Sequence, residues 1–536
     1  MKRVLGFCLA AGVLLDVALW AQEGVTFTRI SEGELATDAG HYFGMAWGDY
    51  DGDGFVDLIL THIGTEANRL YRNNADGTFS LVESGAIAED TPADGWAAWA
   101  DYDNDGDLDL FLSSFDTPDR MYKNLGDGTF AKIPPGEIVP PDESKWGNSA
   151  CWGDLNSDGF VDLYVATTGS GDRSNFIYMN NGDGTMLRSI HAETYYTHSH
   201  LSVMSDINND GYVDLLVGQT NKPMVYLNDG SGNLSPASGP PINRGNDIDI
   251  SSADYDNDGD LDLVVVGPQG NRLYLKSDLG TFTEVLSDAI QSTGSIKSSC
   301  AAWGDYDNDG KIDLFITTYE NEYDFLFHNE GDGVFSRLTD IPLVLRNGYS
   351  WAASWADYDN DGDLDLIVSD GFDQDNLSGS PKPCALYRND GGNQNNWLLL
   401  SLMGNISNGS AFGAKVYATA TIGGKEVTQL REINGHNTEL RAHFGLGDAT
   451  TVEEIRIEWP SGAEQTMTGV AVNQILSVTE LWWPEPTYDG WVDTGDWLGW
   501  LYVEHDPWIW CEDLNHWMYC PSEYITENGA WVYVPK

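Results

Sequence analysis

Nine-residue loops rich in carboxylates recur along this 536-residue chain, and such loops are suited to binding cations. Each offers a side-chain oxygen at positions 1, 3, 5 and 9 and a glycine at position 6, where the turn is sharp. Hard oxygen ligands in this number favour calcium over zinc or copper. The predicted calcium ligands, loop by loop, are Asp49, Asp51, Asp53 and Asp57; Asp101, Asp103, Asp105 and Asp109; Asp154, Asn156, Asp158 and Asp162; Asp206, Asn208, Asp210 and Asp214; Asp254, Asp256, Asp258 and Asp262; Asp305, Asp307, Asp309 and Asp313; and Asp357, Asp359, Asp361 and Asp365.

Two other interpretations of the loops are less consistent with the sequence. An EF-hand needs a glutamate at position 12, but Leu60, Leu112 and Ile316 stand there, inside apolar runs. A single acidic turn can also be held by its own hydrogen bonds, whereas seven copies with the same ligand positions favour bound cations. The sequence therefore predicts up to seven structural calcium ions, with weaker sites where Asn156 and Asn208 replace an aspartate.

The overall charge supports cation binding and excludes some partners. The chain has 84 acidic and 27 basic side chains, for a net charge of −57, and the seven loops alone contain 29 aspartates. Like charges packed so closely are costly unless cations neutralise them. Nucleic acid and anionic membrane surfaces would repel such a chain, so we expect neither as a partner. The sequence does not predict an oligomeric state.

The spacing of the loops predicts the fold that positions them. Successive loops begin 52, 53, 52, 48, 51 and 52 residues apart, which is typical of a repeat protein. In each period an apolar strand enters the loop, a second strand leaves it, and two more follow around a Gly-Asp hairpin signal. Four strands in each of seven repeats predict an all-β fold, a seven-bladed β-propeller over residues 22–391. The last repeat lacks its fourth strand, and we expect Thr26–Ile30 to supply it and close the ring.

The N-terminus predicts secretion. Lys2 and Arg3 precede the apolar stretch Val4–Leu15, and Ala21 offers a small residue for cleavage, so residues 1–21 are predicted to be a signal peptide. A membrane anchor is the rival, but a span usually needs about 20 apolar residues and Asp16 interrupts this one. We therefore expect a secreted, extracellular or cell-surface protein without a transmembrane span in the mature chain.

Two further regions follow the propeller. Residues 392–481 are predicted to form a small β-sandwich-like domain, with strands at 397–402, 414–421, 426–431 and 454–459. Residues 482–536 hold 9 of the 20 tryptophans and are predicted to form β-hairpins, either as a surface attachment module or as a small β-domain with an aromatic core. Cys511 and Cys520 are placed to bridge one hairpin in an oxidising compartment, and the sequence leaves their pairing open.

These patterns carry a family resemblance. The loops, preceded by Trp47-Gly48 and its counterparts, resemble FG-GAP or VCBS repeats, the units of the integrin α-subunit propeller. Ser407-Asn408-Gly409, His443–Gly447 and Glu458–Gly462 resemble the ASPIC/UnbV family, and the order of the two regions is similar to that of the cartilage acidic protein family. The resemblance implies calcium binding and extracellular interaction, including cell adhesion. It does not by itself imply an enzymatic activity. Gly409 stands where the family has a basic residue, and the segment Gly435–Leu440 is altered.

The rim opposite the calcium loops is the predicted binding face. Aromatic and polar residues at the starts of the first strands suit sugars or peptide side chains. The same side chains are also compatible with simply filling the channel. The candidates are His41, Tyr42, Trp96, Trp146, His198, His200, Lys297, Tyr349 and Trp351.

The same face carries the alternative prediction, an enzyme acting on polysaccharides as a lyase or dehydratase. Asp247, His198, His200 and Lys297 have side chains capable of acid–base chemistry. Their spacing does not show that they converge, and no catalytic residue is predicted. An extracellular binding or adhesion module for a protein or glycan partner is the favoured hypothesis.

Overall fold

The computed structural model describes most of the propeller and of the domain that follows it. It covers residues 25–481, except 65, 92–93, 116, 135–145, 169–174, 190–198, 220–223, 238–246, 278–280, 292, 295, 320–321 and 370–381, together with short strands between 491 and 530. The predicted signal peptide at 1–21 lies outside the described residues. No helix among the described residues is long and apolar enough to cross a bilayer.

Seven four-stranded antiparallel sheets dominate the described part of residues 26–390. Their first strands are β3 (Tyr42–Gly48), β7 (Asp94–Ala100), β11 (Trp146–Gly153), β15 (Ser199–Ser205), β19 (Asp249–Ala253), β23 (Ser298–Gly304) and β29 (Ala353–Ala356). The second strands are β4 (Asp57–His62), β8 (Asp109–Ser114), β12 (Asp162–Thr168), β16 (Asp214–Gln219), β20 (Asp262–Val266), β24 (Asp313–Thr318) and β30 (Asp365–Val368).

The outer two strands of each sheet follow the same order. The third strands are β5 (Arg69–Asn73), β9 (Arg120–Asn124), β13 (Phe176–Asn180), β17 (Met224–Asn228), β21 (Arg272–Lys276), β26 (Phe325–Gly331) and β32 (Ala385–Asp390). The fourth are β6 (Phe79–Leu81), β10 (Phe130–Lys132), β14 (Met186–Ser189), β18 (Leu234–Pro236), β22 (Phe282–Val285), β27 (Val334–Leu338) and, in the last sheet, β1 (Thr26–Arg29).

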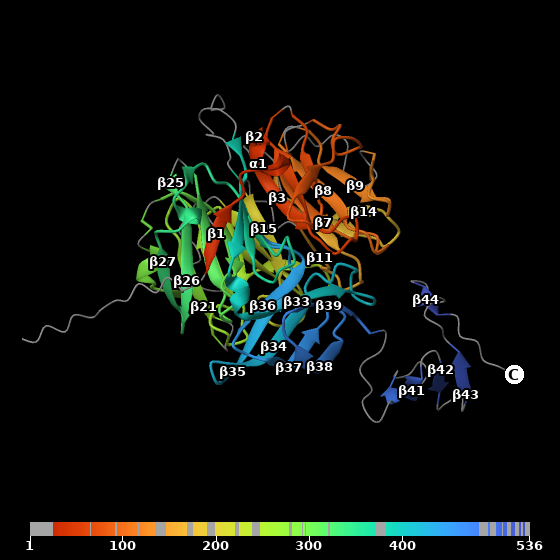
Figure 1. Ribbon diagram of the computed structural model, residues 1–536. Helices are drawn as coiled ribbons and strands as arrows, with labels where there is room; N and C mark the ends of the chain where they lie inside the picture. Colours follow the sequence, from red (N-terminus) through yellow and green to blue (C-terminus); the bar gives the residue numbers. More distant parts are fainter. Residues whose placement is uncertain are drawn as a thin grey trace, which may run out of the picture.

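The sheets form a closed ring. Each first strand contacts the first strand of the next sheet, and β29 of the last sheet contacts β3 of the first. The N-terminal strand β1 pairs antiparallel with β32, with Thr26 opposite Asp390 and Arg29 opposite Tyr387. In Figure 1 it is the red strand among green and teal ones. The predicted β-propeller is therefore confirmed, as is closure by the N-terminal strand.

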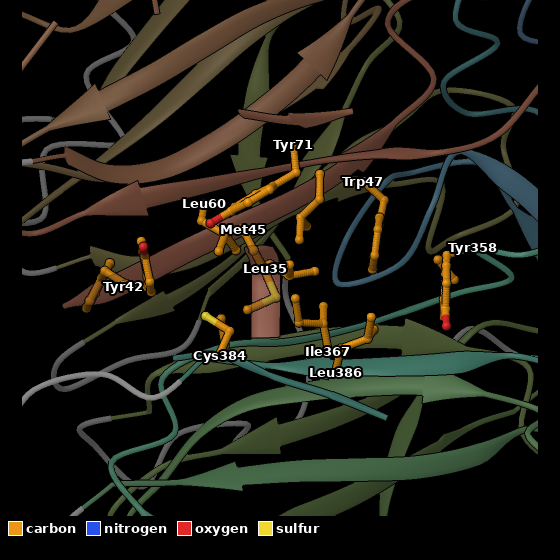
Figure 2. Packing of buried hydrophobic residues seen from close by; sticks show 14 of the residues in the cluster. Leu35, Tyr42, Met45, Trp47, Leu60, Tyr71, Tyr358, Ile367, Cys384 and Leu386 are labelled. Carbon is orange, nitrogen blue, oxygen red and sulfur yellow. The ribbon is translucent and has the colours of Figure 1, made fainter. Parts of the chain in front are cut away.

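Apolar side chains between neighbouring sheets hold the ring together. Where the first and last sheets meet, Trp47, Leu60 and Tyr71 pack with Ile367 and Leu386, all nearly fully buried (Figure 2). The strands that carry these residues are buried on both faces. Their sequences are therefore nearly continuous apolar runs.

Short elements complete the propeller at its edges. Two-stranded ribbons join β2 (Ala39–Gly40) to β31 (Lys382–Pro383) and β25 (Glu322–Tyr323) to β28 (Asn347–Gly348). Single helical turns are α1 (Glu34–Thr37), α2 (Asp288–Gln291), η1 (Pro342–Val344) and η2 (Gly392–Gln394).

Residues 396–480 form a separate two-sheet domain, referred to here as the cap. One sheet orders β36 (Arg441–Gly447), β33 (Asn396–Met403) and β39 (Gln474–Thr479), and β33 and β39 run parallel. The other orders β35 (Lys425–Glu432), β34 (Lys415–Ile422), β37 (Thr451–Glu458) and β38 (Glu464–Ala471). A common apolar core joins the two sheets, as expected for a sandwich.

The tryptophan-rich tail contains the β-hairpins that its sequence predicts. β40 (Trp491–Asp493), β41 (Trp500–His505), β42 (Trp508–Cys511) and β43 (His516–Tyr519) form a four-stranded antiparallel sheet, and β44 (Ile525–Thr526) pairs with β45 (Gly529–Ala530). Cys520 lies outside the described residues.

Candidate functional site

The acidic loops join the first and second strands of the sheets, and their own hydrogen bonds shape them. In the first loop, Asp49 at position 1 accepts from the backbone N–H groups of Asp53 (3.1 Å) and Gly54 (2.9 Å). Asp57 at position 9 accepts from the N–H of Tyr50 (3.1 Å) and from that of Asn73 on β5 (2.8 Å). Gly54 at position 6 has φ +89°, a conformation that favours glycine. Position 1 therefore closes the turn, and position 9 ties it to the third strand.

The position-3 carboxylates leave oxygens without a hydrogen-bond partner. All five loops with aspartate at position 3 have a buried, unpaired oxygen there, on Asp51, Asp103, Asp256, Asp307 and Asp359. The remaining two loops have Asn156 and Asn208, whose amides donate to the position-5 aspartates at 2.9 Å. A buried polar oxygen without a partner is costly. The unpaired oxygens therefore fit a cation ligand, and the asparagines reduce that need in the third and fourth loops.

The predicted ligands converge within loops. In the first, second, fifth and sixth loops, three carboxylates each bring one oxygen within 4.8 Å of the others: Asp49, Asp51 and Asp53; Asp101, Asp103 and Asp109; Asp254, Asp256 and Asp262; and Asp305, Asp307 and Asp313. That spacing suits a single divalent cation held by oxygen ligands.

Burial raises the pKa of the position-9 carboxyls. The pKa is about 8 for Asp57, Asp109, Asp162 and Asp214, and about 9 for Asp262, first because burial penalises the charged form and further because other loop carboxylates are close. A divalent cation would lower these pKa values by supplying the missing positive charge.

Basic side chains from the third strands partly supply that charge. The guanidinium of Arg72 bonds Asp51 (2.5 Å) and Asp53 (3.3 Å) in the first loop. Lys123 pairs with Asp103 and Asp105 in the second. The residue at the same place in the sixth sheet is His328, which lies against Asp307 and Asp313.

Asparagines at the ends of the third strands join each sheet to its neighbour. The amide of Asn124 donates to the carbonyl oxygen of Tyr50 in the preceding loop (2.7 Å) and to that of Leu108 in its own loop (3.1 Å). The equivalent contacts to the preceding loop, at 2.6–2.8 Å, come from Asn73, Asn180, Asn228, Asn329 and Asn389. Lys276 replaces the asparagine in the fifth sheet. An Asn before the hairpin in six of the seven repeats is the sequence signal for this role, which was not predicted.

The cap lies on the rim formed by the acidic loops. Lys415 bonds the position-1 carboxylate of the fourth loop, Asp206 (2.8 Å), and both side chains are about 95% buried. Arg441 donates to the carbonyl oxygen of Asp357 (2.8 Å) and to Asn360 (2.9 Å) in the seventh loop. The cap also contacts the second loop, where Ser410 accepts a hydrogen bond from the N–H of Asp101 (2.8 Å). It contacts the sixth loop through the N–H of Gly447, which donates to the carbonyl of Asn308 (2.8 Å).

Gly409 explains one departure of this sequence from the family pattern. Its N–H donates to Asn104 in the second loop (2.8 Å), and a Cβ placed there would lie 2.4 Å from a carboxylate oxygen of Asp101. The close approach of this backbone to the second loop favours glycine at this position.

The altered segment Gly435–Leu440 enters the propeller channel. The imidazole of His436 bonds Asp249 on β19 (2.9 Å), the amide of Asn437 donates to the carbonyl of Ala301 on β23 (2.9 Å), and Thr438 bridges to Trp355 on β29. The segment thus contacts the first strands of three sheets. His443, by contrast, packs against the rim: its Nε2–H donates to the carbonyl of Gly362 (3.3 Å), and burial lowers its pKa to about 3.

The opposite rim brings several predicted binding residues together. Trp96 and Trp351 both pack on Phe43, with ring centroids 6.2 and 5.4 Å away, and Trp351 stacks on Tyr319 at 4.9 Å. Lys297 lies 5.8 Å from the centre of the Tyr319 ring. Both tryptophans are buried, so they form the floor of this rim rather than exposed platforms.

The remaining candidates are placed less uniformly. His41, His200, Lys297 and Tyr349 are half-buried on the opposite rim. Tyr42 is 1% exposed and packs between the first and last sheets (Figure 2). His198 and the side chain of Trp146 lie outside the described residues. Asp247 is fully buried in an ion pair with Arg272 (2.6 Å).

Comparisons with known proteins agree with this architecture. An FG-GAP-like repeat model matches residues 49–112, 101–165, 206–265, 254–316 and 305–368, together more than half of the chain, and an ASPIC and UnbV model matches 404–481. Mouse cartilage acidic protein 1 is 26% identical, over 58% of this chain and 42% of its own length. Mouse integrin alpha-7 is 34% identical, over 23% of this chain and 12% of its own.

A solved structure of an Agrocybe aegerita lectin, described as recognising non-reducing terminal N-acetylglucosamine, has a TM-score of 0.42 at 19% identity and covers 60% of this chain and 84% of the lectin. The chain spans less than half the length of cartilage acidic protein 1. With its repeated acidic loops and the cap domain that follows them, this chain belongs to the family of FG-GAP-like repeat proteins.

Proposed function

We propose that this chain is an extracellular, calcium-binding propeller that binds a protein or glycan partner with the rim opposite its acidic loops. The position of the cap carries the proposal. Among the described residues, hydrogen bonds from the cap reach the acidic loops and the channel, as Lys415, Arg441 and His436 show. The rim bearing Trp96 and Trp351 is the one that this domain leaves available to a partner.

Structural calcium in the loops is part of the proposal. The unpaired position-3 oxygens and the raised pKa values of the position-9 carboxyls both support a cation held by positions 1, 3, 5 and 9. Bound calcium would supply positive charge between the first and second strands, where the loop carboxylates repel one another. Repetition around the ring favours a stabilising role.

The residues of the opposite rim support a protein or a glycan as the partner. Phe43, Trp96 and Trp351 provide an apolar floor, and half-buried Lys297 and Tyr349 provide polar groups beside it. Aromatic surfaces with polar neighbours bind sugar rings and peptide side chains. Similarity to cartilage acidic protein 1 and integrin alpha-7 supports an extracellular location, and residues 1–21 supply the proposed signal peptide.

A binding experiment with matched variants tests the proposal. The full chain would be applied to a glycan array and to an extracellular-matrix protein array in calcium-containing buffer. We expect binding that Tyr349→Ala and Lys297→Ala abolish, while Lys425→Ala, at an exposed position of the cap, leaves it unchanged. Absence of binding on both arrays, or loss of binding only with the cap variant, would contradict the proposed face.

A further inference from the structure

The sixth acidic loop differs from the others in the residue that faces its carboxylates. The third strands place Arg72 and Lys123 beside positions 3 and 5 of the first two loops, where each acts as a fixed cation. In the sixth sheet the same place on β26 is taken by His328. An imidazole differs from these two residues because its neutral form carries a lone pair that can ligate a metal.

We propose that the sixth loop binds a first-row transition metal ion, such as Zn²⁺ or Mn²⁺, with His328 as a nitrogen ligand beside the loop carboxylates. The inference rests on the cation binding proposed for the loops in general and changes the identity of the ion in one of them. Imidazole nitrogen favours transition metals, whereas calcium prefers an all-oxygen set.

The distances support a common site. Nδ1 of His328 lies 3.2 Å from an oxygen of Asp313 and 3.4 Å from Oδ2 of Asp307. Asp307, Asp309 and His328 each bring one ligand atom within 4.8 Å of the others, and so do Asp305, Asp307 and Asp313. Asp307 belongs to both groups, so the imidazole and the loop carboxylates lie around a shared carboxylate.

Burial separates this site from its counterpart in the first loop. Asp305 and Asp307 are 1% exposed, Asp313 is fully buried, and His328 is 8% exposed, whereas the side chain of Arg72 is 53% exposed. Oδ2 of Asp307 is buried, has no hydrogen-bond partner and lies against the imidazole. An unpaired oxygen in such an enclosed position is the feature that a metal ligand would satisfy.

The cap encloses the same loop. The amide of Asn395, just before the cap, donates to the carbonyl of Asp307 (2.9 Å), and the N–H of Gly447 in the cap donates to that of Asn308 (2.8 Å). A Cβ at Gly445 would lie 2.1 Å from a carboxylate oxygen of Asp305. The hydroxyl of Tyr306 also lies near the imidazole, 3.4 Å from Nδ1, which is long for a hydrogen bond. Nδ1 of His328 therefore faces the loop carboxylates more closely than it faces the hydroxyl.

Cobalt provides a spectroscopic test on the full chain. The protein would be stripped with chelator, supplied with excess calcium, and titrated with Co²⁺ while visible absorption is followed. We expect about one Co²⁺ per chain to remain bound in the presence of calcium. His328→Gln should weaken Co²⁺ binding by at least the roughly 10- to 100-fold that loss of an outer-shell partner costs at metal sites. Calcium stabilisation of the other loops should be retained.

A gain-of-site variant covers the case in which His328→Gln folds poorly. Arg72→His places an imidazole beside Asp51 and Asp53 on a more exposed loop, and we expect it to add a second Co²⁺ site. Displacement of Co²⁺ by an equal concentration of calcium, or equal Co²⁺ affinity in wild type and His328→Gln, would overturn the proposal. Loss of calcium-dependent stability with Co²⁺ binding intact would instead contradict the calcium role of the remaining loops.

Discussion

The two rims of the propeller use side chains in opposite ways. On the acidic-loop rim the same positions recur in every sheet, and the cap contacts them at Asp101, Asp206 and Asp357. On the opposite rim the residues differ from sheet to sheet, and the aromatic rings of Trp96 and Trp351 both pack on Phe43. The recurring loop residues therefore form a scaffold on which the cap docks. The residues that vary from sheet to sheet form a surface that can distinguish a partner.

Calcium removal should produce the largest difference between the rims. Each site occupied at about 100 times its dissociation constant adds about 2.7 kcal/mol to stability, so several sites together contribute on the order of 10 kcal/mol. We expect chelation to lower the melting temperature strongly and to expose the acidic loops to hydrogen exchange before the opposite rim. Magnesium at the same concentration serves as a control. Equal melting with calcium and with chelator would refute calcium stabilisation.

Breaking a buried ion pair under the cap comes next in size. Lys415→Met leaves the carboxylate of Asp206 buried without its cation, and breaking such a pair costs roughly 3–5 kcal/mol. Urea denaturation would measure this loss. The control, Lys297→Met on the opposite rim, removes a cation 5.8 Å from an aromatic ring, a contact worth about 0.5–1 kcal/mol at exposed sites. Similar losses for both variants would mean that the two rims do not differ in this way.

The asparagine links predict a smaller loss confined to the acidic-loop rim. Asn124→Ala removes hydrogen bonds to the carbonyls of Tyr50 and Leu108, and a buried group left unsatisfied costs about 1–3 kcal/mol. Asn74→Ala, which affects exposed bonds to Thr78 and Ser80, is the matched control and should change stability little. Chemical denaturation of the two variants side by side measures whether the loss of stability is confined to Asn124→Ala.

Much of the acidic-loop rim could be predicted because short stretches of sequence define it. Nine residues define each loop, the spacing of about 50 residues defines the repeat, and Thr26–Ile30 matched the missing strand closely enough to predict closure. The position of the cap was not predictable in the same way. Its contacts join residues such as Lys415 and Asp206, which are 209 positions apart, and no periodic pattern connects them.

The opposite rim shows a different limit of sequence reasoning. Position in the repeat places Trp96, Trp351 and Lys297 on one rim, but whether a side chain faces the channel or a neighbouring sheet depends on packing. Tyr42 begins β3 and is buried between sheets, whereas its neighbour His41 precedes the strand and is half-buried. Residue type alone does not distinguish these cases.

Acid should weaken the cap side of the molecule through His443. Burial holds its folded-state pKa at about 3, below the unfolded value of about 6.5, so the unfolded chain binds the proton first as pH falls. His443 therefore contributes a stability that is present above pH 6.5 and declines by about 1.4 kcal/mol per pH unit below it. His443→Gln keeps a donor for the carbonyl of Gly362 and should flatten the denaturation profile between pH 6.5 and 4. His41→Gln, at a half-buried position on the opposite rim, should retain the wild-type slope; an unchanged slope in His443→Gln would show that other groups cause the acid sensitivity.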